Sequence, residues 1–106
     1  MNSGVLLAIS IPIFTTQLEK SREAVDASAI RSAYAEAMTD FLANGATASV
    51  TKTTAAAKST GAWDSKPDWA PELKDKVPTS VTKGTAFTVT VAPGDAGTTT
   101  VTVAQS

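Results

Sequence analysis

Residues 4–14 read Gly4-Val5-Leu6-Leu7-Ala8-Ile9-Ser10-Ile11-Pro12-Ile13-Phe14, and they open a helical pattern that has no clear stop before Asn44-Gly45. One helix over 5–43 would be about 60 Å long at 1.5 Å per residue, whereas a compact chain of this size has a radius of gyration of about 13 Å. The helix must therefore project from the rest of the chain. Its projecting half is apolar on every side, so we expect lipid or further copies of the same helix to cover it.

Beyond Phe14 the helical wheel carries two apolar stripes. At about 100° per residue, the first stripe comprises Phe14, Leu18, Val25 and Ala29, and the nearly opposite second stripe comprises Ala27, Ile30, Tyr34, Ala37, Met38 and Phe41. We expect the second stripe to pack on the chain's own sheet and the first to face neighbouring subunits. The alternative is that both stripes belong to the core of an ordinary helical bundle.

Charged side chains lie between the two stripes, at Glu19, Lys20, Arg22, Glu23, Asp26 and Arg31. We interpret them as a solvated face of the helix. The alternative is that opposite charges pair between adjacent helices of an assembly, where partial burial would strengthen each pair.

The second half of the chain reads as strands and loops. Asn44-Gly45 is a helix stop, because both residues tolerate the left-handed conformation. Residues 46–54 are rich in Thr and predict a strand. Residues 61–78 predict an irregular loop anchored by Trp63, Trp69 and Leu73, and this loop has room for a helical turn at 71–74.

The clearest alternation comes last. In 85–91 and 99–103 the side chains of Phe87, Val89, Val91, Val101 and Val103 share one face and threonines share the other, with 93–97 as the hairpin loop. The predicted fold is α+β, with a long N-terminal helix packed on a small antiparallel sheet of about three strands. The helix occupies 4–44 and the sheet region 45–106.

Composition leaves little room for chemistry. The 106 residues carry a net charge of -1 and contain neither His nor Cys, so the commonest general base, most transition-metal ligands and all disulfides are absent. We expect no enzyme activity, no cofactor and no nucleic-acid partner. Four loop carboxylates could supply oxygen ligands for calcium: Asp64, Asp68, Glu72 and Asp75. The spacing of these carboxylates matches no calcium-loop motif, and lysines between them reduce the negative charge, so calcium is not expected.

The sequence at 4–14, followed by Leu18-Glu19-Lys20-Ser21-Arg22-Glu23-Ala24 and Ile30-Arg31-Ser32-Ala33-Tyr34, resembles the type IV pilin family and its relatives, the pseudopilins of type II secretion and the competence pilins. In that family this stretch is the second half of the hydrophobic N-terminal segment and the start of its polar continuation. The prepilin peptidase site, the methylated first residue and the assembly glutamate would lie upstream. Met1-Asn2-Ser3 does not match them, and we interpret residues 1–3 as replacing a removed segment.

The resemblance implies a structural subunit of a type IV pilus, or fimbrium, that polymerises through its N-terminal helix for surface adhesion and twitching motility. Its partners would be copies of itself, the pilus assembly machinery and, in the full-length form, the membrane. It would lie in the cell membrane before assembly and in an extracellular surface pilus afterwards. The missing disulfide favours a Gram-positive pilin or a pseudopilin.

Two alternatives from the same resemblance stay open: a pseudopilin of a secretion or competence system, and a minor or competence pilin that binds a surface or DNA. The residues expected to pack in the filament or membrane are Val5, Leu6, Leu7, Ile9, Ile11, Pro12, Ile13, Phe14, Leu18 and Val25. Those expected in the helix–sheet core are Ile30, Tyr34, Met38, Phe41, Phe87, Val89, Val91, Val101 and Val103. A secretory signal peptide is a further reading of 4–14, but no basic residue precedes the run.

Overall fold

A computed structural model describes the backbone from Ser3 to Gln105 and the side chains from Gln17 to Gln105. Its elements are helix α1 (Ser3–Ala43), strands β1 (Val50–Ala56), β2 (Gly61–Ala62), β3 (Ser80–Val81) and β4 (Ala86–Pro93), the short 3-10 helix η1 (Asp95–Gly97) and strand β5 (Thr99–Gln105). The predicted long helix on a small antiparallel sheet is confirmed, and the architecture is α+β.

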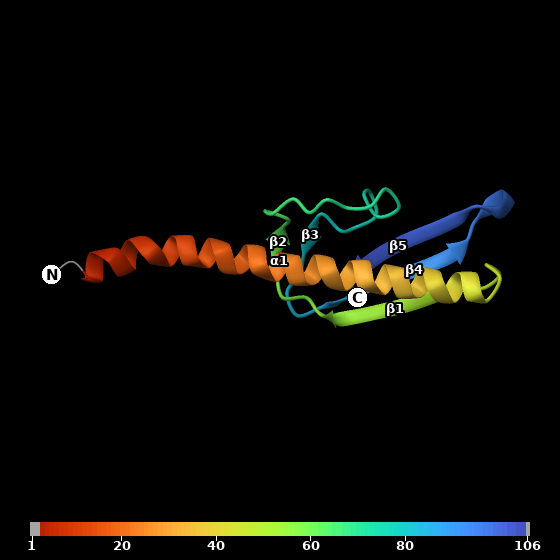
Figure 1. Cartoon of the computed structure of the whole chain (residues 1–106), viewed down its shortest axis with the longest axis horizontal. Coiled ribbons are helices and arrows are strands. Elements are labelled where there is room, and N and C mark those ends of the chain that lie inside the picture. Colours follow the sequence, from red (N-terminus) through yellow and green to blue (C-terminus); the bar gives the residue numbers. More distant parts are fainter. Residues whose placement is uncertain (1–2, 106) are drawn as a thin grey trace.

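Helix α1 makes the molecule elongated. Its C-terminal half lies along the sheet and its N-terminal part extends well beyond every strand (Figure 1). The principal dimensions are 69 × 21 × 19 Å and the radius of gyration is 17.7 Å, which exceeds the value of about 13 Å for a compact chain of this length.

The helix ends where the sequence predicts. Gly45 has a φ of +79°, and the N–H of Ala46 donates to the carbonyl of Phe41 at 2.9 Å, which satisfies one of the last helical carbonyls. The side chain of Asn44 then accepts a hydrogen bond from the N–H of Thr47 at 3.1 Å. Because this turn uses residues up to Ala48, the strand predicted from residue 46 begins only at Val50.

The main sheet has the strand order β1-β4-β5, with both pairs antiparallel. The predicted hairpin is present, because β4 and β5 are paired along all seven residues of β5 and are joined through η1. The connection from β1 to β4 contains β2 and β3, which pair as a separate two-stranded ladder.

The alternation of β4 and β5 is confirmed. On the face toward α1, Phe87, Val89, Val91, Val101 and Val103 are all buried. The opposite face carries threonines that are exposed or half-buried, namely Thr51, Thr53, Thr88, Thr90, Thr100 and Thr102. The hydroxyls of Thr51 and Thr90, which are register partners, lie 2.9 Å apart.

The core lies between this sheet and α1. Ile30, Ala37 and Phe41 of the helix are at most 1% exposed and belong to the same cluster as the inward-facing strand residues. Tyr34 and Met38 are half-buried at its margin. Full burial of a side chain such as that of Phe41 or Phe87 stabilises the fold by about 1.5–3 kcal/mol.

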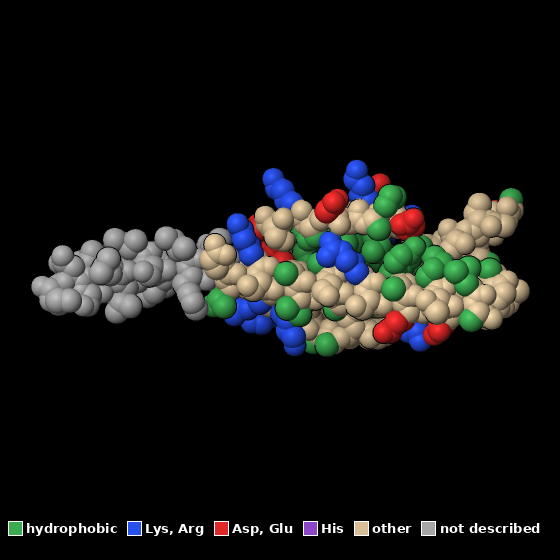
Figure 2. Space-filling model, in the orientation of Figure 1, with side chains coloured by type: hydrophobic (Ala, Val, Ile, Leu, Met, Phe, Trp, Pro, Cys, Tyr) green, Lys and Arg blue, Asp and Glu red, His purple; other side chains and the backbone are tan. Residues whose placement is uncertain are grey.

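The predicted irregular loop is more ordered than the sequence indicates. Its first two residues form β2, which pairs with β3 just beyond the end of the loop, Gly61 with Val81. Strands of two residues are too short to show alternation. The predicted anchors pack on the core: Leu73 is 1% exposed, while Trp63 and Trp69 are half-buried. Figure 2 shows hydrophobic side chains gathered beside α1, between the helix and this loop.

Candidate assembly surface

Helix α1 presents apolar side chains on two sides. The side toward the sheet carries the buried residues Ala27, Ile30, Ala37 and Phe41. Two residues of the other predicted stripe are exposed: Leu18 by 39% and Val25 by 54%. Single exposed hydrophobic side chains are ordinary on a protein surface, and Leu18 and Val25 are of interest because their spacing of seven residues places them on one face of α1.

The remaining residues predicted for filament or membrane packing lie in the first part of α1. Their backbone is helical, and their side chains lie outside the described residues. They are Val5, Leu6, Leu7, Ile9, Ile11, Pro12, Ile13 and Phe14. Ala29, the last member of the exposed stripe, is half-buried.

Asp26 corrects the interpretation of the helix charges as a solvated face. It is 3% exposed, and its carboxylate accepts hydrogen bonds from the N–H of Lys58 at 2.9 Å, the N–H of Ser59 at 2.8 Å and the Ser59 hydroxyl at 2.6 Å. The carboxylate therefore fixes the segment between β1 and β2 against the helix.

Two further carboxylates of α1 bind the chain between β1 and β3. Glu23 is 1% exposed, and its Oε1 accepts from the N–H of Ser65 at 2.7 Å. Its Oε2 has no partner among the described residues. Glu19 accepts from the N–H of Thr60 at 3.1 Å and lies 3.8 Å from Arg22. The three carboxylates form a carboxylate row along α1 (Glu19, Glu23 and Asp26), and it is spaced for helical neighbours at i, i+4 and i+7.

Arg31 continues this attachment toward the other end of the loop. Its Nη2 donates to the carbonyl of Asp68 at 3.0 Å, and its guanidinium lies 5.1 Å from the ring centroid of Trp69. The ring of Trp69 in turn packs edge-on against that of Trp63, with 5.4 Å between the ring centroids. A cation over an indole face adds about 0.5–1 kcal/mol of stability at an exposed site. Arg31 therefore helps to hold the loop against α1.

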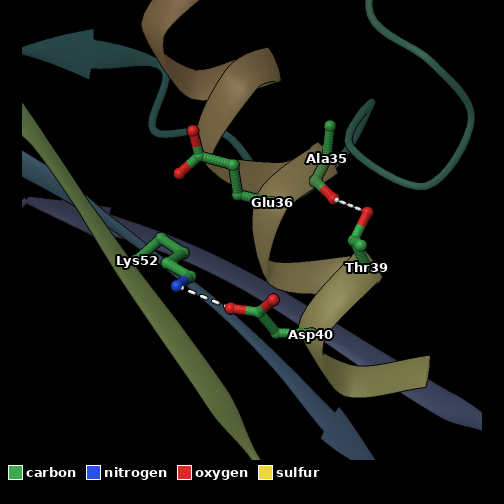
Figure 3. A pocket seen from close by; sticks show the side chains of 5 residues that line it. All are labelled: Ala35, Glu36, Thr39, Asp40 and Lys52. Atoms are coloured by element: carbon green, nitrogen blue, oxygen red, sulfur yellow. Dashed lines mark hydrogen bonds and ion pairs between the residues drawn. The ribbon is translucent and has the colours of Figure 1, made fainter. Parts of the chain in front are cut away.

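The shallow hollow between α1 and β1 is lined by Ala35, Glu36, Thr39, Asp40 and Lys52 (Figure 3). The Nζ of Lys52 lies 2.7 Å from Oδ2 of Asp40, and the Thr39 hydroxyl donates to the carbonyl of Ala35 at 2.8 Å. The hydrogen bond and charge of Asp40 raise the pKa of Lys52 above 10.5. Lys52 is therefore protonated near neutral pH, which suits an ion pair between helix and strand rather than a nucleophile.

The loop carboxylates considered for calcium are all exposed. Among the residues with described side chains, no group of three or more acidic residues is placed to hold a metal ion. In the same part of the chain, no helix combines the length and apolarity required to cross a bilayer.

Comparison with known proteins found no matching family model, no matching curated protein and no matching solved structure.

Proposed function

We propose that the chain is a structural subunit of a type IV pilus that polymerises through its N-terminal helix. One observation carries the proposal: α1 extends far beyond the sheet that covers it, and it exposes Leu18 and Val25 on the side that the sheet does not use. Packing of many such helices side by side would bury this stripe and leave the sheets on the outside.

The carboxylate row supports a division of roles in which one face of α1 holds the chain's own sheet region and the other face packs on neighbouring helices. It ties the β1–β3 connection to residues 19–26 of α1, so the globular part is attached firmly at the point where the helix leaves it. The outward sheet face carries threonine and no charge in β4 and β5, which suits the exterior of a fibre. In this proposal the partners are copies of the chain, the pilus assembly machinery and the membrane from which the subunit is extracted.

Immunogold electron microscopy of the native cells, with antibody raised against residues 17–106, tests the proposal. We expect long labelled surface fibres. When the Val25→Asp variant replaces the parent gene, the fibres should disappear while the subunit remains detectable in the cell. The Lys20→Asp variant is a matched control, because it places the same side chain on the same helix at an exposed polar position. Label confined to the envelope without fibres would reject the pilus in favour of a secretion pseudopilus.

A further inference from the structure

Strand β5 is an edge strand without the features that usually protect a sheet edge. Among the described residues it pairs with β4 alone, over its whole length and without a register shift. Its sequence, Thr-Thr-Val-Thr-Val-Ala-Gln, has no charged residue and no proline, although natural edge strands commonly carry lysine, proline or a bulge. The opposite edge strand, β1, has both a lysine and a register shift.

The backbone groups that β5 leaves free can be identified from the ladder. Gly94 donates to the carbonyl of Thr98 at 2.7 Å, and hydrogen-bonded pairs alternate with non-hydrogen-bonded pairs along an antiparallel ladder. The pairs of Thr99 and Val101 with β4 are therefore non-hydrogen-bonded, and their N–H and C=O groups point to the free edge. The N–H of Phe87, which the same alternation directs away from β5, donates instead to the Thr54 hydroxyl of β1 at 3.0 Å.

An apolar groove of about 270 Å³ adjoins these free groups. The helix supplies Tyr34 and Met38, β5 supplies Thr99 to Val101, and the loop supplies Pro71 with Glu72 and Lys76. Burial raises the pKa of Tyr34 above 10.0, and the Glu72 carboxylate adds to this shift. The groove thus combines an apolar floor, one charge of each sign and a row of unpaired peptide groups.

We propose that β5 and this groove bind an extended peptide segment of another protein as an added strand. Strand addition satisfies the free peptide groups, and it places alternate side chains of the peptide next to Val101, over Tyr34 and Met38. The peptide therefore has apolar residues at alternate positions. Pro71, Glu72 and Lys76 of the loop line the groove together with β5, so it admits a single strand more readily than the sheet of a second copy.

Titration of the isotope-labelled chain with a synthetic peptide, followed by amide and methyl NMR shifts, tests this proposal. The probe is a capped peptide of five alternating valines and threonines with two C-terminal lysines for solubility. We expect shifts at the amides of Thr99 and Val101 and at the methyl group of Met38. The same peptide with every second amide N-methylated keeps its side chains but loses donors, and it should bind at least tenfold more weakly.

Two edge variants separate β5 from β1. Thr99→Pro removes an outward N–H at the first residue of an edge strand, where proline is tolerated, and should weaken binding of the unmodified peptide at least tenfold. Thr51→Pro is the control: by the same alternation its N–H points outward from β1, and binding should change less than twofold. Met38→Gln, of similar size, should weaken binding several-fold.

Absence of shifts at Thr99 and Val101 with millimolar peptide would overturn the proposal, as would equal binding of the N-methylated peptide. If the β5 amides instead shift when the chain alone is diluted, and light scattering shows a dimer, the occupant is a second copy and the peptide assignment is wrong. None of these results depends on whether the chain forms filaments.

Discussion

Replacing Asp26 with alanine should destabilise the fold far more than replacement of an exposed residue, although the sequence pattern places Asp26 on a solvated face of the helix. The change removes the acceptor for the N–H groups of Lys58 and Ser59 and for the Ser59 hydroxyl. Ser59 is 1% exposed, so water cannot readily replace the lost partner. Each buried donor left without an acceptor costs about 1–3 kcal/mol. With the buried N–H and the buried hydroxyl of Ser59 both left without an acceptor, we expect a loss of about 4 kcal/mol in the free energy of unfolding.

Urea denaturation followed by circular dichroism measures this loss, and a thermal melt should show a fall of about 15–30 °C for a domain of this size. Glu19→Ala is the matched control, because its hydrogen bond to the N–H of Thr60 is exposed and its removal should cost less than about 1 kcal/mol. Amide exchange at Ser59 should accelerate in Asp26→Ala but not in Glu19→Ala. Equal losses in the two variants, or a loss below about 1 kcal/mol in Asp26→Ala, would show that the Asp26 hydrogen bonds do not stabilise the fold in this way.

Three further predictions concern the helix faces and the alkaline limb of stability. Phe41→Ala, at a fully buried position, should cost about 3–5 kcal/mol in urea denaturation; a cost below 1 kcal/mol would contradict the assigned core. Val25→Asp, at a position 54% exposed, should leave the melting temperature within a few degrees of the parent, and a collapse of the fold would show that this face is already used within one chain. Burial raises the pKa of Tyr34 above 10.0, and Asp40 raises the pKa of Lys52 above 10.5. Both groups therefore hold their protons to higher pH in the folded state than in the unfolded state. Their contribution to the free energy of unfolding is complete below pH 10 and is lost as pH rises through the folded pKa values. Urea midpoints measured from pH 8 to pH 11 should therefore fall at the alkaline end, and less steeply in the Tyr34→Phe, Lys52→Gln double variant.

The elements with strong periodicity could be predicted from the sequence. The second apolar stripe of the helix and the alternation of Phe87, Val89 and Val91 each repeat often enough to fix a face. In the structure both faces pack in the core, with Tyr34 and Met38 half-buried at its margin. The stop at Gly45 was equally readable, because few residues other than glycine or asparagine adopt its positive φ readily.

The roles of Glu23 and Asp26 could not be read in the same way. Carboxylates spaced three and four residues apart on a helix look identical whether they meet water or a distant loop. Their partners, Ser65 and Ser59, are more than thirty residues away in sequence, and they contribute backbone N–H groups that carry no side-chain signature.

The carboxylate row has a mechanical consequence. Its members lie one after another along the helix axis, so a pull on the projecting end of α1 would load their hydrogen bonds together, in shear. Bonds loaded together must break together, whereas bonds opened from one end yield in turn. Tension applied along the helix axis would thus reach the sheet region through several attachments at once.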